Sequence, residues 1–174
     1  MDIASHGLWV AAALGRKSKK DFWTAFFFGL APDALSVGIF WISVFLGFDG
    51  RPNFKDGHLD ASMLPQYLQM LYNATHSLVI FAVIFMIIWV ILKRPYWLFS
   101  AWGIHILIDI PTHSEKFFPT PFLWPVNDYK VFSLSWSDPR IFIPNLILLA
   151  IVYGWWGFSW RKNNKHKWFS FKLK

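Results

Sequence analysis

Three ionisable side chains recur at four-residue intervals in one apolar segment of this sequence. The segment WGIHILIDIPTHSEKF, residues 102–117, carries His105, Asp109 and His113. Residues four apart on an α-helix are neighbours on one face, so His105 and Asp109 can grip the same ion. Imidazole nitrogen and carboxylate oxygen suit zinc or manganese, and the chain has no cysteine that could supply a thiolate. The spacing therefore predicts a metal-ligand pair, with His113 beyond Pro111 at the start of a loop.

Ionisable residues also interrupt other apolar stretches of the chain, at a depth similar to that of Asp109. Counted from the basic residue that ends each stretch, Asp33, His76 and Asp109 lie 13, 17 and 15 residues inside it. At about 1.5 Å per helical residue these positions are roughly 20 to 26 Å deep, so they converge on one level. His6 reaches the same level if the first two helices form a hairpin. The candidate metal ligands are therefore His6, Asp33, His76, His105 and Asp109.

Each candidate also has a purely structural interpretation. A single histidine in a membrane helix commonly makes a helix-to-helix hydrogen bond. Asp33 follows Ala31 and Pro32, where it could serve as a helix N-cap. Against this, a carboxylate near the bilayer centre costs about 2.5 to 3.5 kcal/mol on insertion scales. Because no Lys or Arg is expected to face Asp33 and Asp109, the set as a whole favours a bound divalent cation.

The elements that position these residues are predicted to be membrane helices. The chain of 174 residues is 55% hydrophobic and 21% aromatic, and its 16% charged residues compare with about 25% in soluble domains. We therefore expect an all-α, polytopic membrane helical bundle of about four spanning helices plus a short membrane-embedded N-terminal helix. The short helix covers residues 1–14; with Asp2 and no Lys or Arg before its apolar run, it is not expected to be a cleaved signal. The predicted spans are residues 22–48, 64–92, 96–110 and 141–160.

Basic residues give the expected orientation. Clusters at residues 16–20, 93–94 and 161–174 hold twelve of the seventeen Lys and Arg, which puts these clusters in the cytoplasm and the site in the outer half of the membrane. The C-terminus is then cytoplasmic. The loops around residues 49–62 and 111–140 face outward. His58 in the first of these loops and His166 in the tail are expected to be solvated.

The net charge of +7 does not require a nucleic-acid partner. Residues 161–174, RKNNKHKWFSFKLK, form a basic cytoplasmic tail that anionic lipid headgroups attract. No nucleic-acid recognition module is visible, so no nucleic acid is expected to bind. The chain therefore divides into a membrane-embedded domain, residues 1–160, and this tail. Its expected partner is the lipid bilayer, and the sequence gives no oligomeric state.

Short motifs around the candidate ligands resemble a known family. HGLW at His6, GLAPD ending at Asp33, NATHS around His76, HILID from His105 to Asp109 and the following THSEKFFPTPFLWP are similar to the YdjM-like family of bacterial inner-membrane proteins. Members of that family are predicted to be metal-dependent hydrolases. The similarity covers residues 1 to about 125. It implies a hydrolase in the bacterial inner membrane.

The order of the ligands is also similar to that in a second, more distant group. The zinc-dependent phospholipase C and single-strand nuclease superfamily consists of helical enzymes that cleave phosphoesters. This likeness implies a metal held by Asp33, His76, His105 and Asp109, with His6 and a shared Asp109 available to a second ion. In that superfamily a further His and a His-x-x-x-acid pair complete a third metal position. Beyond His113 this chain offers only Asp128, Asp138 and His166, so three metals are not expected.

The expected chemistry is hydrolysis of a phosphoester or a lipid-borne ester by metal-activated water, with Asp109 and His113 as catalytic residues. No Ser-His-Asp arrangement or G-x-S-x-G turn offers another nucleophile. The role of His113 stays open between ligand, general acid and surface residue. On the outward loops Lys116, Lys130 or Arg140 could meet an anionic headgroup.

Two other function classes stay open. Intramembrane His and Asp also build ion or proton pathways, so a small metal or proton transporter is the main alternative. It ranks second because Ser36, Ser43 and Ser100 are nearly the only polar residues toward the cytoplasmic side. The third class is a structural or interaction protein in which a closed metal site staples helices together.

Overall fold

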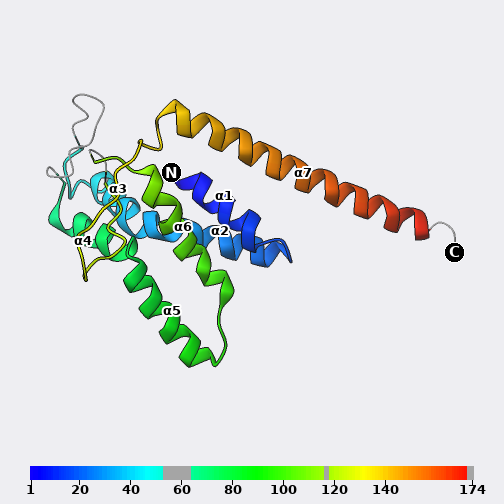
Figure 1. Cartoon of the computed structure of the whole chain (residues 1–174), viewed down its shortest axis with the longest axis horizontal. Coiled ribbons are helices and arrows are strands. Elements are labelled where there is room, and N and C mark those ends of the chain that lie inside the picture. The colour runs from blue at the N-terminus through cyan, green and yellow to red at the C-terminus, as the bar shows by residue number, and fades with distance from the viewer. Residues whose placement is uncertain (53–63, 116–117, 172–174) are drawn as a thin grey trace.

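The structure is a computed structural model that describes residues 1–52, 64–115 and 118–171, with side chains described up to residue 159. The described residues form an all-helical bundle with no β-strand among them (Figure 1). The elements are α1 (Ile3–Leu14), α2 (Lys19–Asp33), the π-helical turn η1 (Ala34–Gly38), α3 (Ile39–Phe45), α4 (Gln66–Thr75), α5 (Leu78–Leu92), the 3-10 turns η4 (Trp97–Phe99) and η5 (Ile110–Thr112), α6 (Ser100–Asp109) and α7 (Pro139–Phe171).

The first two helices form an antiparallel hairpin, which brings the start of α1 beside the end of α2 (Figure 1). Capping side chains define both starts: Asp2 accepts a hydrogen bond from Ser5 N, and Ser18 accepts one from Asp21 N. The turn between them depends on Gly15, where an added Cβ would lie 2.5 Å from Phe22 Cα. His6 therefore returns to the level of the α2 C-terminus, as the hairpin hypothesis required.

A π-helical turn, rather than a break, follows Asp33. From Lys19 to Phe45 the chain is one apolar helix that is long enough to cross a membrane. Pro32 lies inside it, and the widened turn η1 begins directly after Asp33. The Asp33 side chain makes no capping hydrogen bond, so the N-cap interpretation of Asp33 is wrong. Single π-helical turns inside α-helices are common at functional sites.

The predicted span over residues 64–92 is broken in its middle. Helices α4 and α5 meet at an angle of 58°. Ser77 caps α5 by accepting a hydrogen bond from Ile80 N at 3.1 Å, and its hydroxyl donates to the Trp124 carbonyl. If residues 64–92 form a span, it is therefore a bent pair of helices and not one continuous helix. The break leaves His76 at the inner corner, outside both helices.

Two helices are long and apolar enough to span a membrane, Lys19–Phe45 and Pro139–Ser159, and the bent pair α4 and α5 would make a third. The predicted span over residues 96–110 is only the turn η4 followed by the ten-residue helix α6. Ten residues extend about 15 Å, half of the roughly 30 Å hydrocarbon core. The structure therefore does not confirm the predicted number of about four spans. The two or three candidate spans are consistent with association of the protein with a membrane.

Helix α7 docks on α1 through polar side chains and then projects beyond the other helices (Figure 1). Asn145 donates to Ser5 Oγ at 2.8 Å and accepts from Trp9 Nε1 at 2.7 Å. About two helical turns further along α7, Tyr153 donates its hydroxyl to the Leu8 carbonyl at 2.8 Å. These hydrogen bonds fix the rotation of an otherwise apolar helix against its neighbour.

Candidate metal centre

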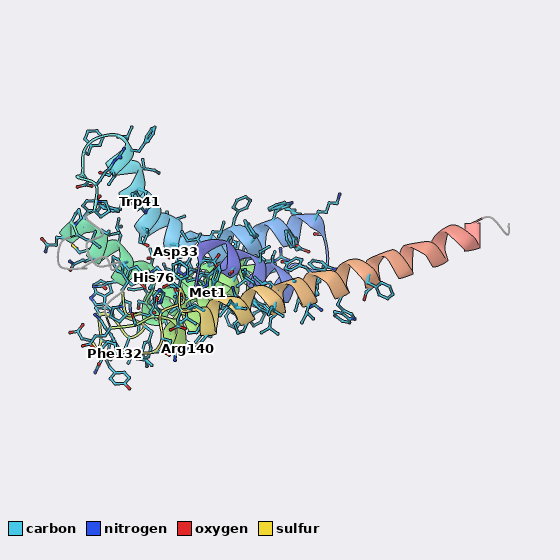
Figure 2. All side chains as sticks on the ribbon, turned by 90° about the horizontal axis from the view of Figure 1, so that it is seen from above. Met1, Asp33, Trp41, His76, Phe132 and Arg140 are labelled. Atoms are coloured by element: carbon cyan, nitrogen blue, oxygen red, sulfur yellow. The ribbon has the colours of Figure 1, made fainter. Side chains whose placement is uncertain are left out.

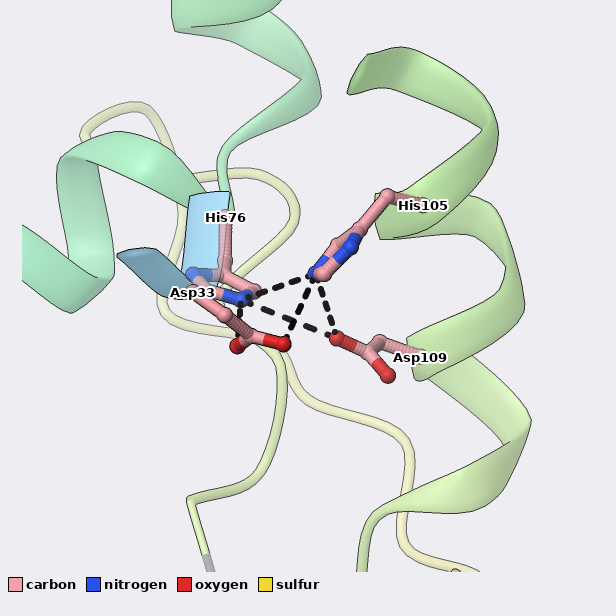
Figure 3. A group of neighbouring side chains, drawn as sticks. All are labelled: Asp33, His76, His105 and Asp109. Atoms are coloured by element: carbon pink, nitrogen blue, oxygen red, sulfur yellow. Dashed lines mark hydrogen bonds and ion pairs between the residues drawn. The ribbon is translucent and has the colours of Figure 1, made fainter. Parts of the chain in front are cut away.

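Four of the five predicted ligands form one cluster. Asp33, His76, His105 and Asp109 each offer a ligand atom, and these atoms lie within 4.8 Å of one another (Figure 3). Asp33 comes from the end of α2, His76 from the corner between α4 and α5, and the other two from successive turns of α6. Residues far apart in sequence thus meet at one point inside the bundle.

Backbone carbonyls orient both clustered histidines. His105 Nδ1 lies 2.7 Å from the Gly29 carbonyl, and His76 Nδ1 lies 3.2 Å from the Tyr72 carbonyl. A carbonyl oxygen can only accept, so these contacts favour the tautomer with the proton on Nδ1; the Thr75 hydroxyl also lies 3.0 Å from His76 Nδ1. In the neutral imidazole the Nε2 atom then presents a lone pair, which is the state that binds a metal.

The Nε2 atoms of His76 and His105 lie close to each other and to the carboxylates of Asp33 and Asp109. The two Nε2 atoms are 3.2 Å apart. Asp109 Oδ2 lies 3.1 Å from His105 Nε2 and 3.6 Å from His76 Nε2. Asp33 Oδ1 lies 3.4 Å from His76 Nε2, and Asp33 Oδ2 lies 3.9 Å from His105 Nε2. Ligands about 2.0 to 2.2 Å from a tetrahedral zinc ion are roughly 3.3 to 3.6 Å apart, so the spacing suits such an ion.

Burial makes this arrangement unfavourable without a cation. His6, His76 and His105 are fully buried, and Asp109 is 1% exposed. Asp109 Oδ2 and both ring nitrogens of His6 make no hydrogen bond of good geometry, although Asp109 Oδ2 lies 3.1 Å from His105 Nε2 and His6 Nε2 lies 2.9 Å from Asp109 Oδ1. Buried polar atoms are nearly always satisfied, and leaving one unpaired costs about 1 to 3 kcal/mol. The donor set therefore fits a divalent metal.

A second group of donors surrounds the other oxygen of Asp109. His6 Nε2 lies 2.9 Å from Asp109 Oδ1, and the ring of His6 stacks on His105 with centroids 3.8 Å apart. His6 is therefore next to the four-residue cluster but is not a member of it. The Met1 ammonium also reaches Asp109 Oδ1, at 2.7 Å, and Thr112 Oγ1, at 3.1 Å. Sequence reasoning considered only Lys and Arg as positive partners and missed this amine.

His113 is buried, not a surface residue on an open loop. Its Nδ1 atom lies 3.5 Å from Asp109 Oδ1 and 3.2 Å from the Asp109 carbonyl. Thr120 Oγ1 is 3.3 Å from the same nitrogen. The surface interpretation of His113 is therefore wrong, because the short turn η5 folds its side chain back onto α6. The roles of ligand and general acid remain.

Tyr72 is a supporting residue that the sequence reasoning did not identify. Its ring stacks on His76 with centroids 3.9 Å apart, and its hydroxyl donates to the Phe118 carbonyl at 2.9 Å. The four-residue step from Tyr72 to His76 was the signal available in the sequence, since such a step places two rings on one helical face.

The remaining predicted residues lie elsewhere. Asp128 and Asp138 are not in the cluster. Arg140 is paired with Asp138 at 2.8 Å, and its side-chain hydrogen bonds lower the pKa of Asp138 to about 2. His58, Lys116 and the side chain of His166 lie outside the described part of the chain.

Comparison of the chain with protein-family models, with curated proteins and with solved structures finds no significant match.

Proposed function

We propose that this protein is a membrane-bound metal-dependent hydrolase that acts on a phosphoester or a lipid-borne ester, with zinc as the preferred ion and manganese as the alternative. One observation carries the proposal. Two carbonyl-oriented imidazoles direct their Nε2 atoms at each other, 3.2 Å apart, between two carboxylates in a buried site. A divalent cation among these four side chains would accept both nitrogen lone pairs and balance the charge of the two carboxylates. The resemblance of the sequence motifs to the YdjM-like family points in the same direction.

When bound, the metal would acidify a water molecule and polarise the ester oxygen. Asp33, His76, His105 and Asp109 would hold it. Asp109 would also be a catalytic residue, since its second oxygen keeps His6 and His113 beside the reacting group. His113 Nδ1 is 3.5 Å from that oxygen. From this position His113 would give a proton to the departing alcohol, the role of a general acid.

The two competing functions fit the site less well. A structural staple needs four ligands in a closed shell, whereas two further histidines, His6 and His113, lie directly beside the four-residue cluster, against Asp109 Oδ1. A transporter needs a polar path that leaves the site. Ser36 donates instead to the Pro32 carbonyl at 2.8 Å, and Ser43 donates to Asp49 at 2.5 Å. Two of the three serines considered for such a path are thus satisfied locally.

The proposed setting is the bacterial inner membrane, with the C-terminus in the cytoplasm and the site in the outer half of the bilayer. Basic clusters in the sequence support this orientation. Reporter fusions after Lys93 and after Lys174 should report a cytoplasmic location, and one near Asp56 should report an external location. A cytoplasmic signal at Asp56 would reverse the orientation.

Metal analysis of the detergent-purified protein, beside turnover of a panel of phosphoester and lipid substrates, tests the function directly. We expect bound divalent metal in stoichiometric amount, loss of turnover on chelation, and recovery when zinc or manganese is restored. A control variant with His58→Ala and His166→Ala should keep its metal. Stoichiometric metal without turnover of any ester would favour the staple, and metal flux into proteoliposomes without turnover would favour transport.

A further inference from the structure

The connection between η5 and α7 carries exposed apolar side chains although it is not helical. We call residues 118–138 the site loop. Val126 is 76% exposed, Tyr129 62%, Phe132 56% and Leu134 40%. The site loop holds only three charged residues, Asp128, Lys130 and Asp138, and Asp138 is paired with Arg140 at the start of α7. Exposed apolar groups of this size are unusual on a water-facing loop, and they indicate a contact with another apolar phase.

Besides the hydrogen bond from the Tyr72 hydroxyl to the Phe118 carbonyl, hydrogen bonds fasten the site loop to the candidate metal centre at two points. At one, Ser133 N donates to the His113 carbonyl at 3.0 Å, and Thr120 lies against the His113 ring. At the other, Leu78 N donates to the Phe122 carbonyl at 2.9 Å, and Ser77 donates to the Trp124 carbonyl. The second point is the corner that holds His76. The site loop thus contacts the backbone next to one proposed ligand and the proposed general acid.

Both views place the site loop at the end of the molecule that holds the metal centre. In Figure 1 it lies beside α4, far from the free end of α7, and in Figure 2 Phe132 is at the periphery of that same end. The loop runs directly into α7, whose first turns expose Ile143 and Ile147. The apolar surface of the loop is therefore continuous with that of a candidate membrane span.

We propose that the site loop is seated in the membrane–water interface, where it presents the metal centre to amphiphilic esters. Three features favour the bilayer as the occupant: the aromatic composition of the loop, its small number of charged residues, and its continuity with α7. Tyr and Trp rings are enriched at this depth because one part of each ring is apolar and the other polar. This inference rests on the proposed function and names its substrate class as a lipid-like ester whose reactive group lies near the headgroups.

The depth of the loop can be measured independently of any activity. Because the chain has no cysteine, single replacements Val126→Cys and Phe132→Cys can be spin-labelled specifically. The labelled protein would be placed in phospholipid nanodiscs that contain no other protein, and collisions with oxygen would be compared with collisions with a water-soluble nickel chelate. Ile147→Cys on exposed α7 and Lys17→Cys in the exposed turn after α1 provide the lipid and water references.

We expect both loop labels to lie between these references, with oxygen favoured over nickel relative to Lys17→Cys. Labels as accessible to nickel as Lys17→Cys would overturn the inference and leave a protein partner as the occupant of the loop. Neither result depends on hydrolysis, so the inference can fail while the proposed function stands, or survive if no ester is cleaved.

Enzyme kinetics then test whether the position of the site loop in the interface affects how the substrate reaches the metal centre. The paired replacement of Tyr129→Ser and Phe132→Ser should lower turnover of an ester carried in vesicles about tenfold, because presentation at the interface is lost. Turnover of a short-chain ester dissolved as monomers should stay within about twofold. Phe158→Ser, an equally polar change on exposed α7, is the matched control and should alter neither. Equal losses on both esters would mean that the loop only supports the fold, which contradicts the inference.

Discussion

Glycines in two regions of the molecule have opposite surroundings. In the helices that carry the metal ligands and His6 (α1, α2 and α6), an added Cβ at Gly29 would lie 2.2 Å from Val10 Cγ2, and one at Gly7 would lie 2.7 Å from the Phe26 ring. In α7 an added Cβ at Gly154 or Gly157 would meet nothing within 4 Å. The same residue type is thus required by close packing in one region and is free of neighbours in the other.

This difference separates the helices that position the metal ligands from the helices that anchor the protein in the membrane. Small residues let α1 and α2 approach closely, and α2 also packs on α6, where the Gly29 carbonyl lies 2.7 Å from His105 Nδ1. In contrast, α5 buries no residue, although it is one of the most apolar helices. Within a bilayer such helices need no protein partner for their apolar faces, because lipid chains cover them. The closely packed helices α1, α2 and α6 therefore determine the geometry of the site, and the exposed apolar helices α5 and α7 anchor it in the membrane.

The largest expected effect comes from Asp109→Asn, which removes a charge from the centre of the closely packed region while keeping the size of the side chain. We expect metal affinity to fall by more than about 100-fold and turnover to be lost, since loss even of an outer-shell partner costs 10-fold to 100-fold. Metal stoichiometry and turnover of the purified variant measure this. Asp138→Asn, an acid outside the cluster, is the matched control and should bind metal normally. An Asp109→Asn protein that holds as much metal and turns over as fast as the parent would refute the site.

Gly29→Ala tests the close approach itself. The new methyl group would collide with Val10, so we expect a loss of about 1 to 3 kcal/mol in stability, as for other overpacked cores. Because the Gly29 carbonyl orients His105, metal affinity should fall about tenfold or more. Thermal unfolding in detergent and metal titration measure the two effects. Adding Val10→Ala removes the colliding atom and should recover a large part of both losses; no recovery would mean that Gly29 acts by another route.

Asn145→Ala should loosen α7 without changing the metal centre. The substitution leaves Trp9 Nε1 and Ser5 Oγ without their partner on α7. Polar contacts between membrane helices contribute about 0.6 kcal/mol on average and at most about 1.7, so the loss of stability should be of this size. The apparent melting temperature should fall while metal stoichiometry is unchanged. A fall in stoichiometry would show that α7 positions the ligands as well.

The smallest effect is expected at Gly154. Alanine there meets no neighbouring atom and favours the helix by about 0.8 to 1 kcal/mol in water, a gain that membrane insertion reduces. Metal binding should not change, and the melting temperature should stay the same or rise slightly. If Gly154→Ala lowered stability as Gly29→Ala is expected to do, the exposed face of α7 would have a close partner, such as a second copy of the chain.

Local sequence was enough to predict the helical, membrane-associated class and the residues that could bind a metal. Runs of apolar residues can satisfy their backbone hydrogen bonds in a bilayer only as helices or closed barrels, so composition alone restricts the fold. The step from His105 to Asp109 fixed their common face, because helical geometry repeats within four residues. The same logic brought Asp33 and His76 to one level, since each lies a similar number of residues into its apolar stretch.

Only the tertiary structure decided how these residues meet. The corner at His76 depends on Ser77 capping α5 and bonding the Trp124 carbonyl, a contact between residues 47 apart. The burial of His113 depends on how η5 folds back, and the stacking of His6 on His105 depends on the approach of α1 to α6. Counting residues along a helix predicts only how deep a residue lies in the membrane. The direction in which its side chain points also depends on the rotation of the helix about its axis and on the bends between helices. Packing between segments distant in sequence determines both.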